Sequence, residues 1–66
     1  MDIELNGERR SVADHLSITE LLAAEGLAGR RVAVEVNGEI APRGTHAERR
    51  LQPGDRIEIV HALGGG

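Results

Sequence analysis

Residues 51–66 read LQPGDRIEIVHALGGG, and this stretch decides the fold. Residues 53–55, Pro-Gly-Asp, have the composition of a tight turn. After the turn, Ile57 and Ile59 alternate with charged residues, which predicts a half-buried strand over residues 56–61 with both isoleucines facing inward. Only two residues separate this strand from Gly64-Gly65-Gly66, so a rigid element leads into a glycine tail.

A hairpin is predicted at the start of the chain. Ile3 and Leu5 alternate with polar residues, which is typical of a half-buried strand. Asn6-Gly7 follows, and this pair fits a type I′ turn because both central residues of that turn need a positive φ angle. We expect the return strand to run from about Glu8 to Val12.

A second hairpin is predicted in the middle of the chain. Valines alternate with other residues over positions 32–36, and Asn37-Gly38 then repeats the turn signal. A short strand at residues 39–41 should end at Pro42, because proline lacks the N–H group that a sheet ladder requires. The repeated Asn-Gly-Glu sequence is interpreted as shared turn chemistry and not as an internal repeat.

One main helix is predicted over Ser17–Gly26. Ser17 and Glu20 form the S-x-x-E pattern of a capping box, in which each side chain bonds the backbone of the other residue. Gly26 is well placed as a left-handed helix terminator. A similar Thr-x-x-Glu pattern at residues 45–48 predicts one short helical turn before the last strand.

These elements predict an α+β fold, with a four- or five-stranded mixed sheet and the helix packed across one face. We expect the first and last strands to pair in parallel near the middle of the sheet. Residues 1–63 would form one domain and residues 64–66 a flexible tail. The predicted inward residues are Ile3, Leu5, Val12, Ile18, Leu21, Leu22, Val32, Val34, Val36, Ile57 and Ile59.

The composition excludes several functional classes. The chain of 66 residues has no aromatic residue and no cysteine, so its core is aliphatic and it offers no disulfide or thiol chemistry. A net charge of −3 without aromatic stacking platforms argues against nucleic-acid binding. No signal peptide or membrane span is recognisable, and we expect a cytoplasmic protein. The arginine pairs at 9–10, 30–31 and 49–50 are either a local basic patch or part of a solvated mixed-charge surface.

The titratable residues do not suggest a catalytic set. His15, His46 and His61 lie in three separate predicted elements, and without cysteines they lack the spacing of metal ligands. The carboxylates are dispersed, and no phosphate-binding loop or nucleophile motif is present. We therefore expect that the domain is not an enzyme and holds no cofactor or metal. We also expect it to be a monomer when free.

The terminal glycines are the strongest functional candidates. A carboxylate reacts with nucleophiles only after activation, for example as an acyl-adenylate, and activation requires the terminus to enter a narrow site on another protein. Glycines lack Cβ, so Gly64 and Gly65 would form a thin arm that carries the Gly66 carboxylate. The alternative is a flexible chain end without function.

Apolar residues beside the tail predict a docking surface. If Ile57 and Ile59 face the helix, Val60 and Ala62 face the other side of the sheet, which no second helix covers. Together with Leu63, they are candidate partner contacts. The alternative is that they are ordinary exposed aliphatic residues.

Three segments carry a resemblance to a known family: IELNGE at residues 3–8, VEVNGEIAPR at residues 34–43, and LQPGDRIEIVHALGGG at residues 51–66. The chain resembles the ThiS family, the sulfur carriers of thiamin thiazole biosynthesis, over nearly its whole length. A G-D-x-I-x-I-V strand that ends in terminal glycines is characteristic of these ubiquitin-like, β-grasp proteins. Similar proteins often carry an aromatic residue where Val60 stands.

The resemblance implies a β-grasp fold and a sulfur-transfer cycle. A ThiF-like enzyme would use ATP to adenylate the Gly66 carboxylate, and a sulfur donor system would convert the adenylate into a thiocarboxylate. A ThiG-like thiazole synthase would then accept the sulfur. ATP would belong to the activating enzyme, and the carrier itself would need no cofactor.

Two other readings of the sequence stay open. A MoaD-like carrier for molybdopterin synthesis, or for another sulfur-requiring pathway, would use the same terminal chemistry. A non-covalent β-grasp interaction domain would carry the glycines without using them. Thiocarboxylate formation separates the interaction domain from the carriers, and the pathway partner separates the carriers from one another.

Overall fold

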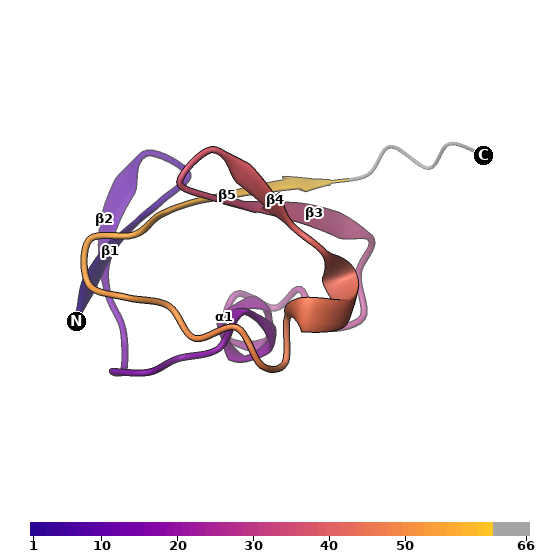
Figure 1. Cartoon of the computed structure of the whole chain (residues 1–66), viewed down its shortest axis with the longest axis horizontal. Helices are drawn as coiled ribbons and strands as arrows, with labels where there is room; N and C mark the ends of the chain where they lie inside the picture. Colours follow the sequence, from indigo (N-terminus) through magenta and orange to yellow (C-terminus); the bar gives the residue numbers. More distant parts are fainter. Residues whose placement is uncertain (62–66) are drawn as a thin grey trace.

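The computed structural model describes residues 1–61, which form a single mixed sheet with one helix beneath it (Figure 1). The sheet order is β2-β1-β5-β3-β4. β1 and β5 are parallel neighbours, and β5 is antiparallel to β3 on its other side, so the predicted central pairing of the first and last strands is confirmed. The strands are β1 (Asp2–Leu5), β2 (Glu8–Ser11), β3 (Val32–Val36), β4 (Glu39–Ala41) and β5 (Arg56–His61).

Both hairpins turn at the predicted Asn-Gly pairs. The φ angles are 49° at Asn6 and 86° at Gly7, and they are 52° at Asn37 and 86° at Gly38. Positive angles at both central positions are the signature of the type I′ turn, whose twist matches that of the flanking strands. The turns therefore set the register of β1 with β2 and of β3 with β4.

The main helix, α1 (Ile18–Ala24), begins and ends as its sequence predicts. The Ser17 hydroxyl accepts from the Glu20 backbone N–H, and the Glu20 side chain accepts from the Ser17 N–H, which completes the capping box. At the other end, Gly26 has a φ angle of 75°, and the Leu27 N–H bonds the Leu22 carbonyl at 2.8 Å. These contacts form a Schellman motif that stops the helix.

The core lies between α1 and the inner face of the sheet. Nine of the eleven predicted inward residues are buried, whereas Val12 and Ile59 are only partly buried against the core. Val12 lies just beyond the end of β2, and Ile59 lies in the half of β5 that extends past its last β1 partner. Ala41 and Leu51, which the sequence analysis did not place inside, complete the core with 3% and 1% exposure.

The segment between β4 and β5 differs in part from its prediction. The predicted turn at 45–48 is present, because the Glu48 and Arg49 N–H groups bond the Thr45 carbonyl at 3.1 and 2.8 Å. The 3₁₀ helix η1 (Arg43–Thr45), which was not predicted, comes directly before it. The predicted Thr-x-x-Glu cap is wrong, because the Glu48 N–H bonds the backbone carbonyl of Thr45 and the Thr45 hydroxyl donates to the Pro42 carbonyl at 2.7 Å. Pro42 has the extended conformation that precedes η1, so η1 starts directly after it.

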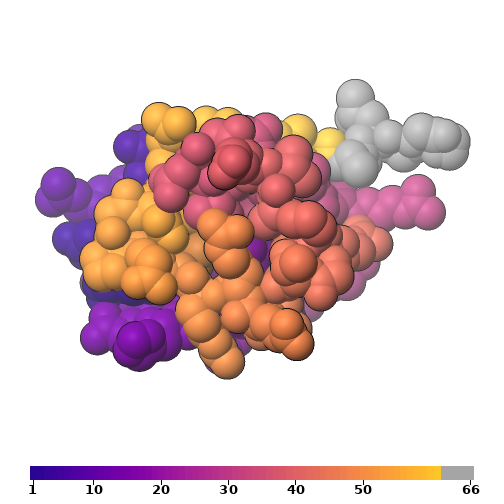
Figure 2. Space-filling model, in the orientation of Figure 1, coloured from indigo at the N-terminus to yellow at the C-terminus, as the bar shows by residue number. Residues whose placement is uncertain are grey.

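This segment also closes the front of the molecule. In Figure 2 the orange residues between β4 and β5 cover the layer between sheet and helix. Leu51 anchors the segment in the core, and the Leu51 N–H bonds the Leu16 carbonyl at 2.8 Å. No helix within residues 1–61 has the length and apolar character to cross a membrane.

Candidate functional site

The two Asn-Gly turns, which we call the asparagine turns, form hydrogen bonds with the last strand, β5, from both sides. The Ile59 N–H donates to Oδ1 of Asn6 at 2.8 Å, and the Arg56 N–H donates to Oδ1 of Asn37 at 2.9 Å. Asn37 also donates from Nδ2 to Oδ1 of Asp55 at 3.0 Å. Each turn therefore supplies a side-chain acceptor to β5, the strand that precedes the tail.

Sequence reasoning missed this role of the asparagines. The signal was present in the repeated Asn-Gly-Glu sequence, but a repeated turn alone does not show which strand its side chain contacts. β1 ends at Leu5, opposite Ile57, so β5 continues beyond its neighbour. The Asn6 side chain supplies the acceptor that a longer β1 would have supplied through its backbone.

Val60 is exposed on the side of the sheet that α1 does not cover, as predicted. Its side chain is 52% exposed, and it pairs with Ala33 across β3. Ile40 on β4 is 60% exposed and belongs to the same side, because Ile40 and Glu58 both pair with Glu35. We name this surface the outer face and define it by Ala33, Glu35, Ile40, Glu58 and Val60.

Ile40 was not predicted as a surface contact. In the three-residue strand β4, either Ile40 or Ala41 could have faced inward by alternation alone. The pairing of Ala41 with the buried Val34 places the smaller residue inside and Ile40 outside. The outer face therefore has two large apolar side chains where the sequence indicated one.

Two carboxylates lie directly opposite each other on the outer face. Glu35 and Glu58 are Cα partners across β3 and β5, and within residues 1–61 neither forms an ion pair. Like charges in that position destabilise a sheet, typically by a few tenths of a kcal/mol to ~1 kcal/mol. An unfavourable pair beside exposed aliphatic residues is the kind of local conflict that is expected at functional or strained sites.

The tail itself lies beyond the described residues. Ala62 and Leu63, predicted as partner contacts, and Gly64, Gly65 and Gly66, predicted as the reactive arm, all fall outside residues 1–61. His61 is the last described residue and pairs with Val32 at the beginning of β3. This pairing marks the end of the molecule from which the chain continues toward the tail.

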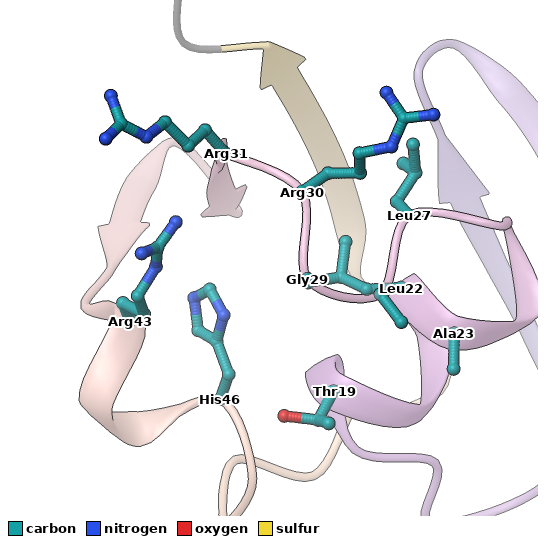
Figure 3. A pocket seen from close by; sticks show the side chains of 10 residues that line it. Thr19, Leu22, Ala23, Leu27, Gly29, Arg30, Arg31, Arg43 and His46 are labelled. Carbon is teal, nitrogen blue, oxygen red and sulfur yellow. The ribbon is translucent and has the colours of Figure 1, made fainter.

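A surface pocket of about 450 Å³ lies at the same end. Figure 3 shows Arg43 and His46 on one wall, helix residues on the other, and Arg30 and Arg31 on the loop that leads into β3. We name this site the arginine pocket. Its lining residues are Thr19, Leu22, Ala23, Leu27, Ala28, Gly29, Arg30, Arg31, Arg43 and His46.

The three histidines are separate in space as well as in sequence. His46 is 7% exposed, and its Nε2 lies 2.9 Å from the Ala41 carbonyl. A carbonyl can only accept, so Nε2 carries the proton and the imidazole links η1 to the end of β4. His15 and His61 are exposed, and within residues 1–61 no three His, Cys, Asp or Glu side chains converge as metal ligands.

Five of the arginines fall into two groups. Arg10 forms a two-pronged ion pair with Glu25, with N–O distances of 3.0 and 3.1 Å, and Arg50 contacts Glu20 at 3.1 Å. The arginines of the pocket form no ion pair with any residue of the described range 1–61. The prediction of a mixed-charge surface therefore fits the first group. Of the three arginine pairs considered as a basic patch, only residues 30–31 line the pocket, together with Arg43, which the sequence analysis did not include.

Comparison with known proteins gives a consistent family assignment. A family model described as the ThiS family matches residues 3–66. The chain is 40% identical over 65 residues to the sulfur carrier protein ThiS of Bacillus subtilis, and the match covers 97% of this chain and 98% of that protein. The crystal structure of the thiamine biosynthesis protein ThiS from Geobacter metallireducens superposes with a TM-score of 0.87 at 36% identity, covering 100% of both chains.

A longer relative is also similar to this chain. A thiazole synthase of Paramagnetospirillum magneticum is 39% identical over 66 residues, which is 100% of this chain. The chain spans only 20% of the length of that relative. The similarity therefore concerns one segment of a larger polypeptide.

Proposed function

The chain belongs to the ThiS family, and from this premise we propose that it carries sulfur as a thiocarboxylate on Gly66 for thiazole formation in thiamin biosynthesis. The match to the family extends through residue 66, so it includes the glycines to which the chemistry is assigned. This is the observation that carries the proposal. It requires Gly66 to be the last residue of the functional protein.

The proposed cycle has three steps. A Gly66 carboxylate oxygen attacks the α-phosphorus of ATP in a ThiF-like enzyme, and pyrophosphate leaves. Sulfide delivered by the donor system attacks the acyl carbon, AMP leaves, and the new carbon–sulfur bond gives the thiocarboxylate. The thiocarboxylate then passes its sulfur to the substrate of a ThiG-like thiazole synthase, and an oxygen replaces that sulfur on the Gly66 acyl carbon, which regenerates the carboxylate.

The fold supports this cycle by providing a rigid base for the arm. β5 has strand neighbours on both sides and is bonded to Asn6 and Asn37. A fixed strand limits the positions that the following residues can reach, which reduces the entropy lost when the terminus enters an active site. The outer face, with Val60 and Ile40 exposed, gives a partner an apolar surface next to that arm.

The thiazole synthase relative favours the thiamin pathway over molybdopterin synthesis. In that relative, a segment similar to this whole chain belongs to a protein named as a thiazole synthase. Domains joined in one polypeptide frequently work on the same reaction. A separate ThiG-like synthase is therefore the proposed acceptor of the sulfur from this chain.

Changes in tail length test the proposed attachment site. Deleting Gly66 moves the terminal carboxylate by up to ~3.5 Å along an extended chain, and ångström-scale misplacement can cost on the order of 100-fold in rate. Adding an alanine after Gly66 places the reacting carboxyl on a different residue. We expect both variants to fold normally but to form almost no thiocarboxylate, as measured by intact mass with ATP, activating enzyme and sulfur donor. Thiolation of either variant at the wild-type rate would refute the proposal.

A further inference from the structure

We propose that the arginine pocket is a docking site for an acidic segment of the activating enzyme. The inference rests on the proposed function in one respect, namely that the enzyme that receives the tail carries this segment. The pocket is separate from the outer face, because α1 and η1 lie on the opposite side of the sheet (Figure 1). It would therefore add a second contact area to the one described above.

The charge of the pocket is opposite to that of the chain. The whole sequence has 11 acidic and 8 basic residues, but the described lining of the pocket includes three arginines and no carboxylate. None of these arginines forms an ion pair within residues 1–61, whereas Arg10 and Arg50 do. Three exposed guanidinium groups around one pocket create a local positive potential that attracts an anionic ligand.

The lining favours carboxylates on a peptide over a free inorganic ion. Leu22, Leu27 and the alanines at positions 23 and 28 provide apolar surface below the arginines. Apolar residues of an acidic segment can pack there while its carboxylates meet the guanidinium groups. The planar fork of arginine pairs with a carboxylate through two parallel hydrogen bonds. A volume of about 450 Å³ holds a few side chains.

The location of the pocket identifies the partner. Arg31 precedes Val32, and Val32 pairs with His61, the last described residue before the tail. Figure 3 shows β5 ending beside Arg31 at the rim of the pocket. A protein that encloses the tail must therefore approach this end of the molecule, so an acidic segment at its entrance would meet the pocket.

The distribution of charge would also fix the orientation of docking. The outer face presents Glu35 and Glu58, whereas the pocket presents Arg30, Arg31 and Arg43. A partner with complementary charges can bind in one orientation only, because rotation would bring like charges together. Such patterning acts mainly on the association rate and on specificity.

The test compares two double variants with the same change in net charge. Arg31→Gln/Arg43→Gln removes two charges from the pocket, and Arg9→Gln/Arg49→Gln removes two exposed arginines outside it. All four side chains are exposed, so both variants should fold, which circular dichroism verifies. We expect the pocket variant to associate with the ThiF-like enzyme about tenfold more slowly at low salt, with a smaller difference at high salt. Equal rates for the two variants would overturn the proposal.

A second measurement examines the pocket without the enzyme. In nuclear magnetic resonance titrations of the full chain, an oligoglutamate peptide should shift the amide signals of residues 29–31 and 43–46, and the pocket variant should not respond. A response to inorganic phosphate but not to the peptide would overturn the choice of an acidic segment. Peptide binding without an effect on the enzyme association rate would overturn the choice of partner. If the wild-type chain is never thiolated, the proposed function fails, and the titration still decides whether the pocket binds acidic peptides.

Discussion

Glu20 stabilises the start of α1 through several contacts with one carboxylate. Its Oε1 accepts from the Ser17 N–H at 2.9 Å and from the Arg50 guanidinium at 3.1 Å. Hydrogen bonds from the Ser17 backbone and hydroxyl, and then the charge of Arg50, hold the pKa of Glu20 below its usual value. Because the folded pKa is lower than the unfolded one, ionised Glu20 favours the folded state.

This shift gives a pH-dependent prediction for Glu20→Gln. Glutamine can keep the cap geometry but lacks the charge, so the variant should be less stable than the wild type at neutral pH. The contribution of ionised Glu20 is present above its unfolded pKa and is lost as the pH falls through the folded pKa, so the two proteins should converge in acid. Urea unfolding at a series of pH values measures this difference. A difference that does not change with pH would contradict the assignment, and Glu48→Gln serves as the exposed control.

Val60 is the residue on the outer face that can be tested most directly. Its side chain is 52% exposed, so Val60→Asp should leave the fold intact while placing a charge in the proposed interface. We expect affinity for the activating enzyme or the thiazole synthase to fall by about tenfold, as is typical when an apolar interface contact is lost. Ala13→Asp adds the same charge at an exposed loop position and should bind normally. If Val60→Asp binds both partners as well as this control does, Val60 is not a contact.

At the scale of elements, the asparagine turns connect the two hairpins to β5. Asn6 bonds the Ile59 N–H on one side, and Asn37 bonds the Arg56 N–H on the other. The bond from the Ile59 N–H to Asn6 is the one nearer to the tail. It holds the part of β5 that follows Ile57, the last residue of β5 with a partner in β1. Asn6 therefore serves both as a turn residue and as an extension of β1.

The variants Asn6→Gly and Asn6→Asp separate these two roles. Asn6 has a φ angle of 49°, which glycine adopts without strain, so Asn6→Gly keeps the turn and removes the acceptor. Loss of one hydrogen bond of this kind costs about 0.5–1.5 kcal/mol, so the Ile59 amide should exchange with solvent several-fold faster. Asn6→Asp keeps an acceptor, so the Ile59 amide should exchange with solvent as slowly as in the wild type. The Arg56 amide, bonded to Asn37, is the internal control, and equal acceleration of both amides would mean general destabilisation.

Much of the fold could be predicted at this scale, because the deciding signals are local. Alternation placed the valines of β3 inside, Asn-Gly pairs set both turns, and the capping box set the start of α1. The cap at Thr45 was predicted wrongly because a hydroxyl can donate or accept, and the local pattern does not show which. The arginine pocket could not be predicted, because it joins residues 27–31 with residues 43–46 only in the folded chain.

At the scale of the whole molecule, stability depends on a small aliphatic core. A domain of this size buries a smaller share of its surface than larger domains do, and here no aromatic residue adds volume. Leu51 is 1% exposed and belongs to the long segment between β4 and β5. Within the described residues it is the buried apolar side chain of this segment, and it packs in the core between sheet and helix.

Leu51→Ala should therefore greatly reduce the free energy of unfolding of so small a domain. Truncation of a buried leucine costs about 2–5 kcal/mol, whereas whole domains are stable by only about 5–15 kcal/mol. We expect a large fall in the urea midpoint or loss of the folded state at room temperature. Ile40→Ala, at a residue that is 60% exposed, should change stability little. Similar losses for the two variants would contradict the assignment of Leu51 to the core.

The thiocarboxylate itself can be located because the chain has no cysteine. After incubation with ATP, the activating enzyme and the sulfur donor, iodoacetamide has no thiol of this chain to modify, so alkylation at neutral pH reports the transferred sulfur. Arg56 is the last arginine, and the chain has no lysine, so trypsin cleaves after Arg56 and releases residues 57–66 as one peptide. Fragmentation by mass spectrometry should place the alkylated sulfur on Gly66. An unlabelled peptide, or a label at any other position, would contradict the account.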